Sequence, residues 1–264
     1  MARPIVTLTT DYGNSDHLVG VIKGVILNIN PEAEIVDITH NVLPFDLLDG
    51  ALAIGHAHKY FPPKTIHLVV VDPGVGTVRR PILVRGDNHF FVAPDNGVLS
   101  KVYEQQTMLT AWHITAEHYF TQPVSNTFHG RDIFAPVAAW LSKAYQFNAF
   151  GDEITDIVKL SIPKPKVEGN AVKGVVLKVD NFGNLITNIT VEDAPVLVAA
   201  DGKFKIRVGK GEVGRLATNF AEGASGEMFG IIGSGGSLEV STNKGNAARA
   251  LGANRGSEVV VETV

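Results

Sequence analysis

The feature that most constrains the fold is the alternation of strand-like and helix-like segments through the first half of the chain. β-rich apolar runs lie at 4–10, 33–39, 65–72 and 89–95. Apolar residues recur at helical spacing at 15–30, 45–61 and 131–147. Such an alternation is typical of a mostly parallel sheet with helices on its faces. The unbroken apolar run at 65–72 further indicates a strand buried on both faces.

Residues at the ends of the predicted helices fit this interpretation. Ser15 or Asp16 is placed to cap the 15–30 helix. Pro62 is expected to end the 45–61 helix. Pro136 is tolerated in or near the first turn of the 131–147 helix.

The second half of the chain has a different pattern. A joint with proline, lysine and glycine at 161–171 leads into short β-rich runs separated by glycine turns. Short strands at close spacing favour an antiparallel sheet or a small barrel. We therefore expect an α/β protein with a Rossmann-like N-terminal domain at 1–165, built on a mostly parallel sheet, and a smaller antiparallel β-barrel domain at 166–264. Two domains also create a crevice, where small-molecule sites often lie.

The composition disfavours several classes of protein. The net charge of −4 makes nucleic acid an unexpected partner, because phosphate-binding proteins usually carry a basic patch. Cysteine is absent, which excludes disulfides and thiolate metal sites. The N-terminus lacks the apolar core of a signal peptide, and no apolar run approaches the ~20 residues of a membrane span. We expect a cytoplasmic globular protein with no membrane partner.

Carboxylates followed by glycine stand at the ends of three predicted strands. Asp11, Asp72 and Asp95 occur in the sequences DYG, DPGVG and DNG. Parallel strands would place all three at one carboxyl edge of the sheet, where open α/β sheets bind ligands. Asp180, in VDNFGN, ends the first strand of the second domain in the same way. Turn formation alone is the alternative explanation for each motif.

The same region contains no recognisable phosphate loop. The loop after Asp72 lacks the Gly-Lys-Ser/Thr ending of a P-loop and does not open a helix with G-x-G-x-x-G. His129 precedes a predicted helix and is a second candidate for chemistry. A hard cation held by Asp11, Asp72, Asp95 and His129 is conceivable, but no ligand spacing requires one. We expect no metal ion and no cofactor.

Five motifs in a fixed order carry a family resemblance: TLTTDYG, VVVDPGVGTVRR, APDNG, TFHGRDIFAPVAA and VDNFGNLITNI. With them the chain resembles, over essentially its whole length, the S-adenosyl-L-methionine (SAM) hydrolases, also called SAM hydroxide adenosyltransferases, which are relatives of the bacterial fluorinase and chlorinase. The resemblance implies an α/β domain followed by a β-barrel. It also implies a homotrimer whose active sites lie between the N-terminal domain of one chain and the C-terminal domain of its neighbour. The implied reaction converts SAM and water into adenosine and L-methionine.

The resemblance also assigns roles to individual residues. It implies a catalytic set of Asp72, Arg79 and His129, with Arg80 as the other candidate for the arginine. It implies that Asp11 binds the ribose hydroxyls, that Phe45 lies against the nucleoside, and that Phe182 and Asn184 bind adenine. The methionine end would be bound by Asp180, Asp16, Ser234 and Glu239. Core packing of Phe45 and Phe182, and helix capping by Asp16, are the alternatives from the residues alone.

Two positions distinguish the chain from the halogenating relatives. Asp72 replaces a tyrosine and Gly235 replaces an arginine, and a carboxylate at the reacting centre would repel a halide. Water is therefore the expected nucleophile, although the group that accepts its proton is left open. A SAM halogenase, a metal-dependent hydrolase and a non-catalytic adenosine or SAM sensor are the alternative functions. The sequence also leaves open which sulfonium epimer is the preferred substrate. Selectivity for the (R) epimer is one of the two alternatives.

Overall fold

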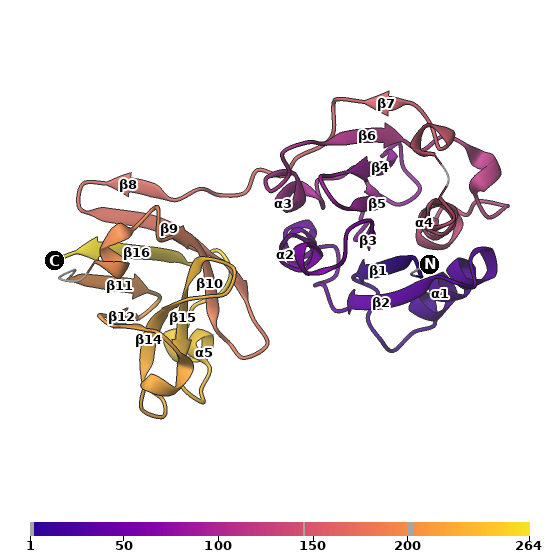
Figure 1. The fold of residues 1–264 in the computed structure, drawn as a ribbon. Coiled ribbons are helices and arrows are strands. Elements are labelled where there is room, and N and C mark those ends of the chain that lie inside the picture. Colours follow the sequence, from indigo (N-terminus) through magenta and orange to yellow (C-terminus); the bar gives the residue numbers. More distant parts are fainter. Residues whose placement is uncertain (1–2, 145, 200–202) are drawn as a thin grey trace. The chain divides into compact units, whose positions relative to one another are not determined.

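The computed structural model describes residues 3–144, 146–199 and 203–264, and the chain divides into two compact units (Figure 1). The first unit ends at Ser161 and the second spans Ile162–Val264. The boundary that the sequence suggested, after residue 165, lies slightly further along the chain. None of the helices in the described part has the length and apolar character that a membrane span requires.

The first unit is built on a seven-stranded sheet in the order β2-β1-β3-β5-β4-β6-β7. Four strands run parallel to their neighbours: β2 (Glu34–Thr39), β1 (Ile5–Thr10), β3 (Ile66–Val70) and β5 (Phe90–Pro94). Three further strands extend the sheet in antiparallel fashion: β4 (Pro81–Arg85), β6 (Thr110–His113) and β7 (Glu153–Ile154). The expected α/β class is confirmed, and the antiparallel extension was not predicted from the sequence.

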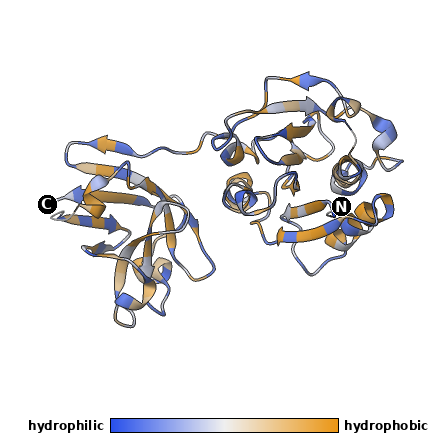
Figure 2. Ribbon diagram, viewed as in Figure 1, coloured by the Kyte–Doolittle hydropathy of each residue, from blue (hydrophilic) through white to orange (hydrophobic). Residues whose placement is uncertain are grey.

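Helices cover both faces of this sheet. Helices α1 (Leu18–Ile29) and α4 (Ala135–Ser142) pack together on one face, and α2 (Leu47–Ala57) and α3 (Ser100–Tyr103) on the other (Figure 1). Strand β3 is buried along its whole length, with Leu68 in one core and Val69 in the other. Figure 2 shows the hydrophobic residues gathered along these central strands. The predicted burial of β3 on both faces is confirmed.

The helix ends follow local chemistry, with one correction. His17 occupies the N-cap position of α1 and makes no side-chain capping bond, so the expected cap by Ser15 or Asp16 is wrong. Asp46 does cap α2, because its carboxylate accepts a hydrogen bond from the Asp49 N–H. Pro136 lies in the first turn of α4, as expected. A π-helical turn, Gly130–Phe134, precedes that helix and was not foreseen.

The second unit is an almost entirely antiparallel sheet that curls on itself. Its strand order is β12-β11-β16-β9-β10-β15-β14-β13, with β8 paired to β9, and β12 comes to lie beside β14. The strands are β8 (Lys166–Glu168), β9 (Ala171–Val179), β10 (Leu185–Thr190), β11 (Phe204–Val208), β12 (Gly211–Val213), β13 (Leu216–Ala217), β14 (Met228–Ile232), β15 (Ser237–Thr242) and β16 (Glu258–Thr263). A short helix, α5 (Ala247–Leu251), packs against its core. The curled sheet agrees with the expected antiparallel β domain.

Candidate active site

Aspartates collect at the carboxyl edge of the first sheet, as the sequence predicted. Asp11 directly follows β1, Asp72 follows β3, and Asp95 directly follows β5, and these strands are parallel neighbours. Asp95 differs from the other two because its carboxylate binds Arg80 (Nη2–Oδ2, 2.6 Å) and accepts the Val158 N–H (2.8 Å). It therefore fastens a neighbouring segment to the sheet and does not face the pocket described below.

Asp72 forms a two-pronged ion pair with Arg79. The guanidinium Nε lies 2.9 Å from both carboxylate oxygens, and Nη2 donates to Oδ2. Both side chains are largely buried, with exposed fractions of 6% for Asp72 and 9% for Arg79. Arginine holds its charge in such a site and matches the two carboxylate oxygens geometrically. Arg79, and not Arg80, is the partner of Asp72.

A tight loop returns the chain from Asp72 to Arg79. The Val75 N–H bonds to the Asp72 carbonyl (3.3 Å), and Thr77 bonds to Gly74 in the same way (3.1 Å). Gly76 sits at φ 77°, and a Cβ there would collide with the Asn126 carbonyl. This position requires glycine for its left-handed backbone and for the close approach of the neighbouring loop.

His129 joins the same cluster through its Nδ1 atom, which lies 2.9 Å from Nη2 of Arg79. A guanidinium can only donate hydrogen bonds, so Nδ1 must accept and the neutral ring carries its proton on Nε2. Burial and the charge of Arg79 lower the pKa of His129, and the charge of Asp72 opposes them. Because the single lone pair of the ring is used by Arg79, His129 cannot act as a base in this arrangement.

A pocket of about 250 Å³ opens beside this cluster. The residues that line it are Asp11, Tyr12, Leu18, Pro44, Phe45, Asp72, Val75, Thr127 and Gly130. The structure thus brings three of the predicted site residues together, Asp11, Phe45 and Asp72. Asp16 lies exposed in the loop between β1 and α1 and is not among the described residues of the lining.

Asp11 and Phe45 are directly linked. The Phe45 N–H donates to Oδ2 of Asp11 (2.9 Å), while the aromatic ring is 71% exposed. Burial raises the pKa of Asp11, the Phe45 N–H lowers it, and the nearby charge of Asp72 adds to the rise. The exposure of Phe45 shows that core packing, the alternative explanation for this aromatic, is wrong.

The other residues that line the pocket were not predicted as site residues: Tyr12, Leu18, Pro44, Val75, Thr127 and Gly130. Tyr12 and Gly130 are in direct contact with each other. Tyr12, in DYG, packs edge-on against Phe128 with ring centroids 5.8 Å apart. Its hydroxyl lies against Gly130, where a Cβ would collide with it. A glycine directly after His129 was the available signal, but glycine at a helix start has too many ordinary explanations to indicate a tyrosine contact.

The second unit brings together the other predicted residues. Asp180 organises the β9–β10 loop: Oδ1 accepts the N–H groups of Phe182 (2.9 Å) and Asn184 (2.8 Å), and Oδ2 accepts the Asn184 side-chain amide (2.8 Å). This arrangement is an Asx turn, which explains the VDNFGN motif locally. It leaves the ring of Phe182 74% exposed at the tip of the loop, so core packing is wrong for this aromatic too.

Glu239 lies on β15, and Ser234 lies exposed in the turn between β14 and β15. Burial raises the pKa of Glu239, and the charge of Asp180 raises it further. The carboxylates of Asp180 and Glu239 are therefore close enough to repel each other. No basic side chain of the described residues forms an ion pair with Glu239. Such a pair of carboxylates favours a cationic ligand group.

Comparison with known proteins places these features in a family. The model of the SAM hydroxide adenosyltransferase N-terminal domain matches residues 6–151, and that of the C-terminal domain matches residues 174–260. The chain belongs to the SAM hydroxide adenosyltransferase family. The (R)-S-adenosyl-L-methionine hydrolase of Salinispora tropica is 35% identical, with 98% of this chain and 97% of the relative covered.

Two further relatives extend this placement in the SAM hydroxide adenosyltransferase family. The crystal structure of an uncharacterized conserved protein from Thermotoga maritima superposes with a TM-score of 0.91 at 41% identity, covering 97% of this chain and 99% of that one. A fluorinase from an Actinoplanes species is 29% identical and aligns with less of both chains, 71% of this one and 72% of the relative. The family resemblance inferred from the sequence motifs is confirmed.

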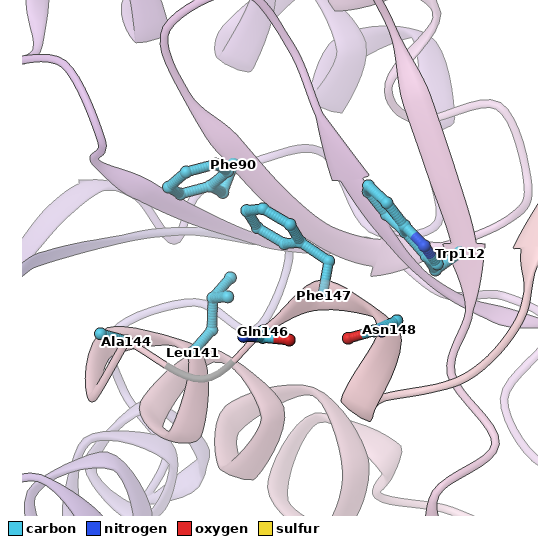
Figure 3. Close-up of a pocket in the computed structure, with 7 residues that line it drawn as sticks. All are labelled: Phe90, Trp112, Leu141, Ala144, Gln146, Phe147 and Asn148. Carbon is cyan, nitrogen blue, oxygen red and sulfur yellow. The ribbon is translucent and has the colours of Figure 1, made fainter.

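Another cavity of the first unit, of about 520 Å³, is less suited to the chemistry of this family. Figure 3 shows the rings of Phe90, Phe147 and Trp112 gathered there, with the amides of Gln146 and Asn148 beside them. The described residues that line it include no titratable side chain. Within the described ranges no three His, Asp or Glu side chains are arranged to hold a metal ion.

Proposed function

We propose that this chain is an enzyme that hydrolyses S-adenosyl-L-methionine to adenosine and L-methionine. The observation that carries the proposal is the Asp72–Arg79–His129 cluster, with Asp72 in the wall of a pocket that Asp11 and Phe45 also line. Membership of the SAM hydroxide adenosyltransferase family, and relatives named (R)-S-adenosyl-L-methionine hydrolase, support the same reaction. We further propose a preference for the (R)-sulfonium epimer.

Water attacks C5′ of the substrate in this mechanism. The O–C5′ bond forms while the C5′–S bond breaks, and the bonding pair stays on sulfur. Methionine therefore leaves as a neutral thioether and needs no general acid. The oxygen becomes strongly acidic as it bonds to carbon, so a weak base is enough to take its proton.

Asp72 is the proposed base and water-orienting group. Its oxygens have lone pairs beyond those that Arg79 uses, and it lines the pocket. Arg79 fixes the plane of the carboxylate, and His129 fixes Arg79. Alignment of the water opposite the breaking bond is the main contribution, and such positioning can remove several kcal/mol from a barrier. The proton then passes from Asp72 to solvent.

The remaining predicted residues bind the substrate in this proposal. Oδ1 of Asp11 accepts hydrogen bonds from the ribose hydroxyls, while Oδ2 retains its hydrogen bond with the Phe45 N–H. The ring of Phe45 lies against the nucleoside. The two ends of the substrate are bound mainly by residues of the second unit of a neighbouring subunit. Phe182 and Asn184 contact adenine, Asp180 and Glu239 attract the methionine ammonium together with Asp16, and Ser234 binds the methionine carboxylate.

We also propose a homotrimer whose neighbouring subunits complete each site. At about 250 Å³, the pocket is smaller than the roughly 300–1,000 Å³ usual for pockets that enclose a small molecule. Further walls are therefore needed, and the family resemblance suggests that the C-terminal domain of a neighbouring subunit supplies them. Sedimentation velocity of the purified chain tests the trimer. A cytoplasmic location stays a prediction.

The decisive experiment uses both SAM epimers in halide-free buffer made with ¹⁸O-labelled water. Equal amounts of adenosine and methionine, with the label in adenosine, are expected, and the (R) epimer should disappear first. The label identifies attack at C5′ by water. Asp72→Asn, which keeps the shape of the side chain but lowers its basicity, should lose turnover more than it loses adenosine affinity.

The alternatives predict other products. A SAM halogenase would form 5′-halo-5′-deoxyadenosine when fluoride or chloride is added, and the carboxylate of Asp72 at the pocket argues against halide binding. A metal-dependent hydrolase would lose activity with a chelator. A sensor would bind adenosine or SAM and release no methionine, which would disprove the proposed hydrolysis.

A further inference from the structure

The guanidinium of Arg79 has a third neighbour in addition to Asp72 and His129. Its Cζ atom lies over the ring of Phe134, 5.0 Å from the centroid. The edges of the guanidinium carry the hydrogen bonds to Asp72 and His129, and Nη1 is buried with no acceptor among the described residues. The ring of Phe134 therefore supports the face of a cation whose edges are already directed elsewhere.

Phe134 reaches this place because of the π-helical turn. Residues 130–134 form the turn, which His129 precedes and Phe134 ends, and the Ala135 N–H bonds back to the Gly130 carbonyl. At 3.6 residues per turn, an α-helix would rotate residues five apart by about 140°. A π turn joins residues five apart and keeps them on one side of the helix, and such turns are frequent at functional sites.

The chemistry of a ring suits this position better than a third hydrogen-bonding group. A second carboxylate under Arg79 would leave the cluster with a net negative charge beside the attacking water. An aromatic face holds the cation by its quadrupole and adds no charge. Phe134 is fully buried, so it cannot touch the substrate itself and can act only through Arg79.

We infer that Phe134 is a positioning residue for the hydrolysis: its ring fixes the plane of Arg79, and through Arg79 the carboxylate of Asp72. This inference rests on the proposed function. It predicts that the electrostatic strength of the ring at position 134, and not only its volume, sets the turnover rate.

The test replaces Phe134 by 4-fluoro-, 3,5-difluoro- and 3,4,5-trifluorophenylalanine. These rings keep nearly the same shape while their faces become progressively less negative. The kcat for SAM should fall stepwise, by about tenfold across the series, with KM within about twofold. A flat kcat across the series would overturn the inference, because packing alone does not depend on the face potential.

Phe134→Leu and Phe150→Leu form a matched pair of substitutions that use a standard amino acid. Both phenylalanines are fully buried in the same core, and Phe150 packs against Tyr119, 4.9 Å away, and not over a guanidinium. At a temperature well below unfolding, Phe134→Leu should lower kcat about tenfold and Phe150→Leu by less than twofold. Equal losses in the two variants would show a purely structural role.

A second measurement does not depend on activity. Phe134→Leu and Arg79→Met are combined in a double-mutant cycle, and the unfolding equilibrium constants are measured in urea. The two changes should be coupled by a factor of about ten, whereas Phe150→Leu and Arg79→Met should combine independently. If the two changes were coupled but the wild type did not hydrolyse SAM, the proposed function would be refuted while the Phe134–Arg79 contact would still be supported. Independent effects would refute the contact.

Discussion

The backbone N–H of Phe45 donates a hydrogen bond to Oδ2 of Asp11, a residue 34 positions earlier in the chain. This bond holds Phe45 at φ 65°, in the left-handed region that a bulky side chain rarely adopts. Strain of this kind persists where the surrounding structure enforces it, and it is concentrated at binding and catalytic sites. The aromatic ring is thereby presented to the pocket and not to the core.

Two substitutions at Phe45 separate the strain from the ring. Phe45→Ala keeps the left-handed strain. Phe45→Gly removes this strain, and the entropic cost of introducing glycine is smaller than the strain energy that it relieves. The glycine variant should therefore be more stable than the alanine variant by about 1 kcal/mol in urea unfolding. Both should raise the KM for SAM by about tenfold, because both lose the aromatic face. Equal stabilities would disprove the strain, and an unchanged KM would disprove the contact with substrate.

The hydrogen bond between Arg79 and His129 gives a second prediction. The side-chain oxygen of asparagine can occupy nearly the place of Nδ1, so His129→Asn keeps an acceptor for Nη2 of Arg79 while His129→Ala removes it. We expect His129→Asn to keep kcat within a few-fold and His129→Ala to lose about 10- to 100-fold, the usual effect of leaving a buried partner unsatisfied. If both variants lost activity equally, His129 would be the base after all.

The pH profile checks the same assignment. Protonation of His129 would replace its acceptor by a second donor facing Arg79. Activity of the wild type should therefore fall as the pH drops through the pKa of His129, which burial and Arg79 place below its usual 6.5. The His129→Asn variant cannot titrate there, so its kcat should lack this acidic limb.

Several parts of the site could be predicted from the sequence because they follow from parallel strand geometry. Strands β1 and β3 are apolar runs that end in an aspartate, and parallel neighbours must bring such ends together. Asp11 and Asp72 therefore lie at one edge of the sheet. The exposure of Phe45 was less predictable, because nothing in the motif LPFD indicates a positive φ.

The choice between the two arginines shows where sequence reasoning ends. Adjacent residues of an extended segment point to opposite sides, so Arg79 and Arg80 are expected to have different partners, but the alternation alone does not say which of them faces Asp72. In the structure each takes one aspartate: Arg79 binds Asp72, and Arg80 binds Asp95. The π turn that positions His129 and Phe134 was equally unpredictable from the motif TFHGRDIFAP.

A buried group of three histidines predicts acid sensitivity of the fold. The ring of His67 packs 5.1 Å from that of His89 and 6.2 Å from that of His58, and burial, aided by both neighbours, lowers the pKa of His67 to about 2. The unfolded chain takes up a proton at about pH 6.5 and the folded chain does not. The contribution of neutral His67 to stability is therefore fully present above pH 6.5. Below that pH the free energy of unfolding should fall by about 1.4 kcal/mol per pH unit from His67 alone.

His67→Asn tests this effect. The asparagine keeps a polar partner for the hydroxyl of Thr7, which lies 2.7 Å from Nδ1 of His67, but it cannot take up a proton. The variant should be less stable at pH 8, because of the lost ring, yet its free energy of unfolding should decline less steeply between pH 6 and pH 4.5. His118→Asn, at an exposed position, is the surface control. An unchanged slope in His67→Asn would refute the prediction.

The ionised side chain of Glu239 is expected to lower the stability of the fold while it favours substrate binding. Burial and the charge of Asp180 raise the pKa of Glu239, so ionisation costs more in the folded chain than in the unfolded one. The folded state then binds protons more readily, and stability falls as the pH rises through the raised pKa. Glu239→Gln should accordingly be more stable than the wild type at pH 7, with a smaller difference near pH 4.

The same variant should bind substrate less well, because the proposed attraction of Glu239 for the methionine ammonium is lost. We expect a raised KM for SAM with kcat nearly unchanged, measured beside the unfolding curves. Asp180→Asn is the contrasting control: Asp180 holds its loop through three hydrogen bonds, so its variant should lose stability as well as affinity. If Glu239→Gln gained stability but kept its KM, Glu239 would be a buried charge outside the substrate site, and the ammonium would depend on Asp180 and Asp16 alone.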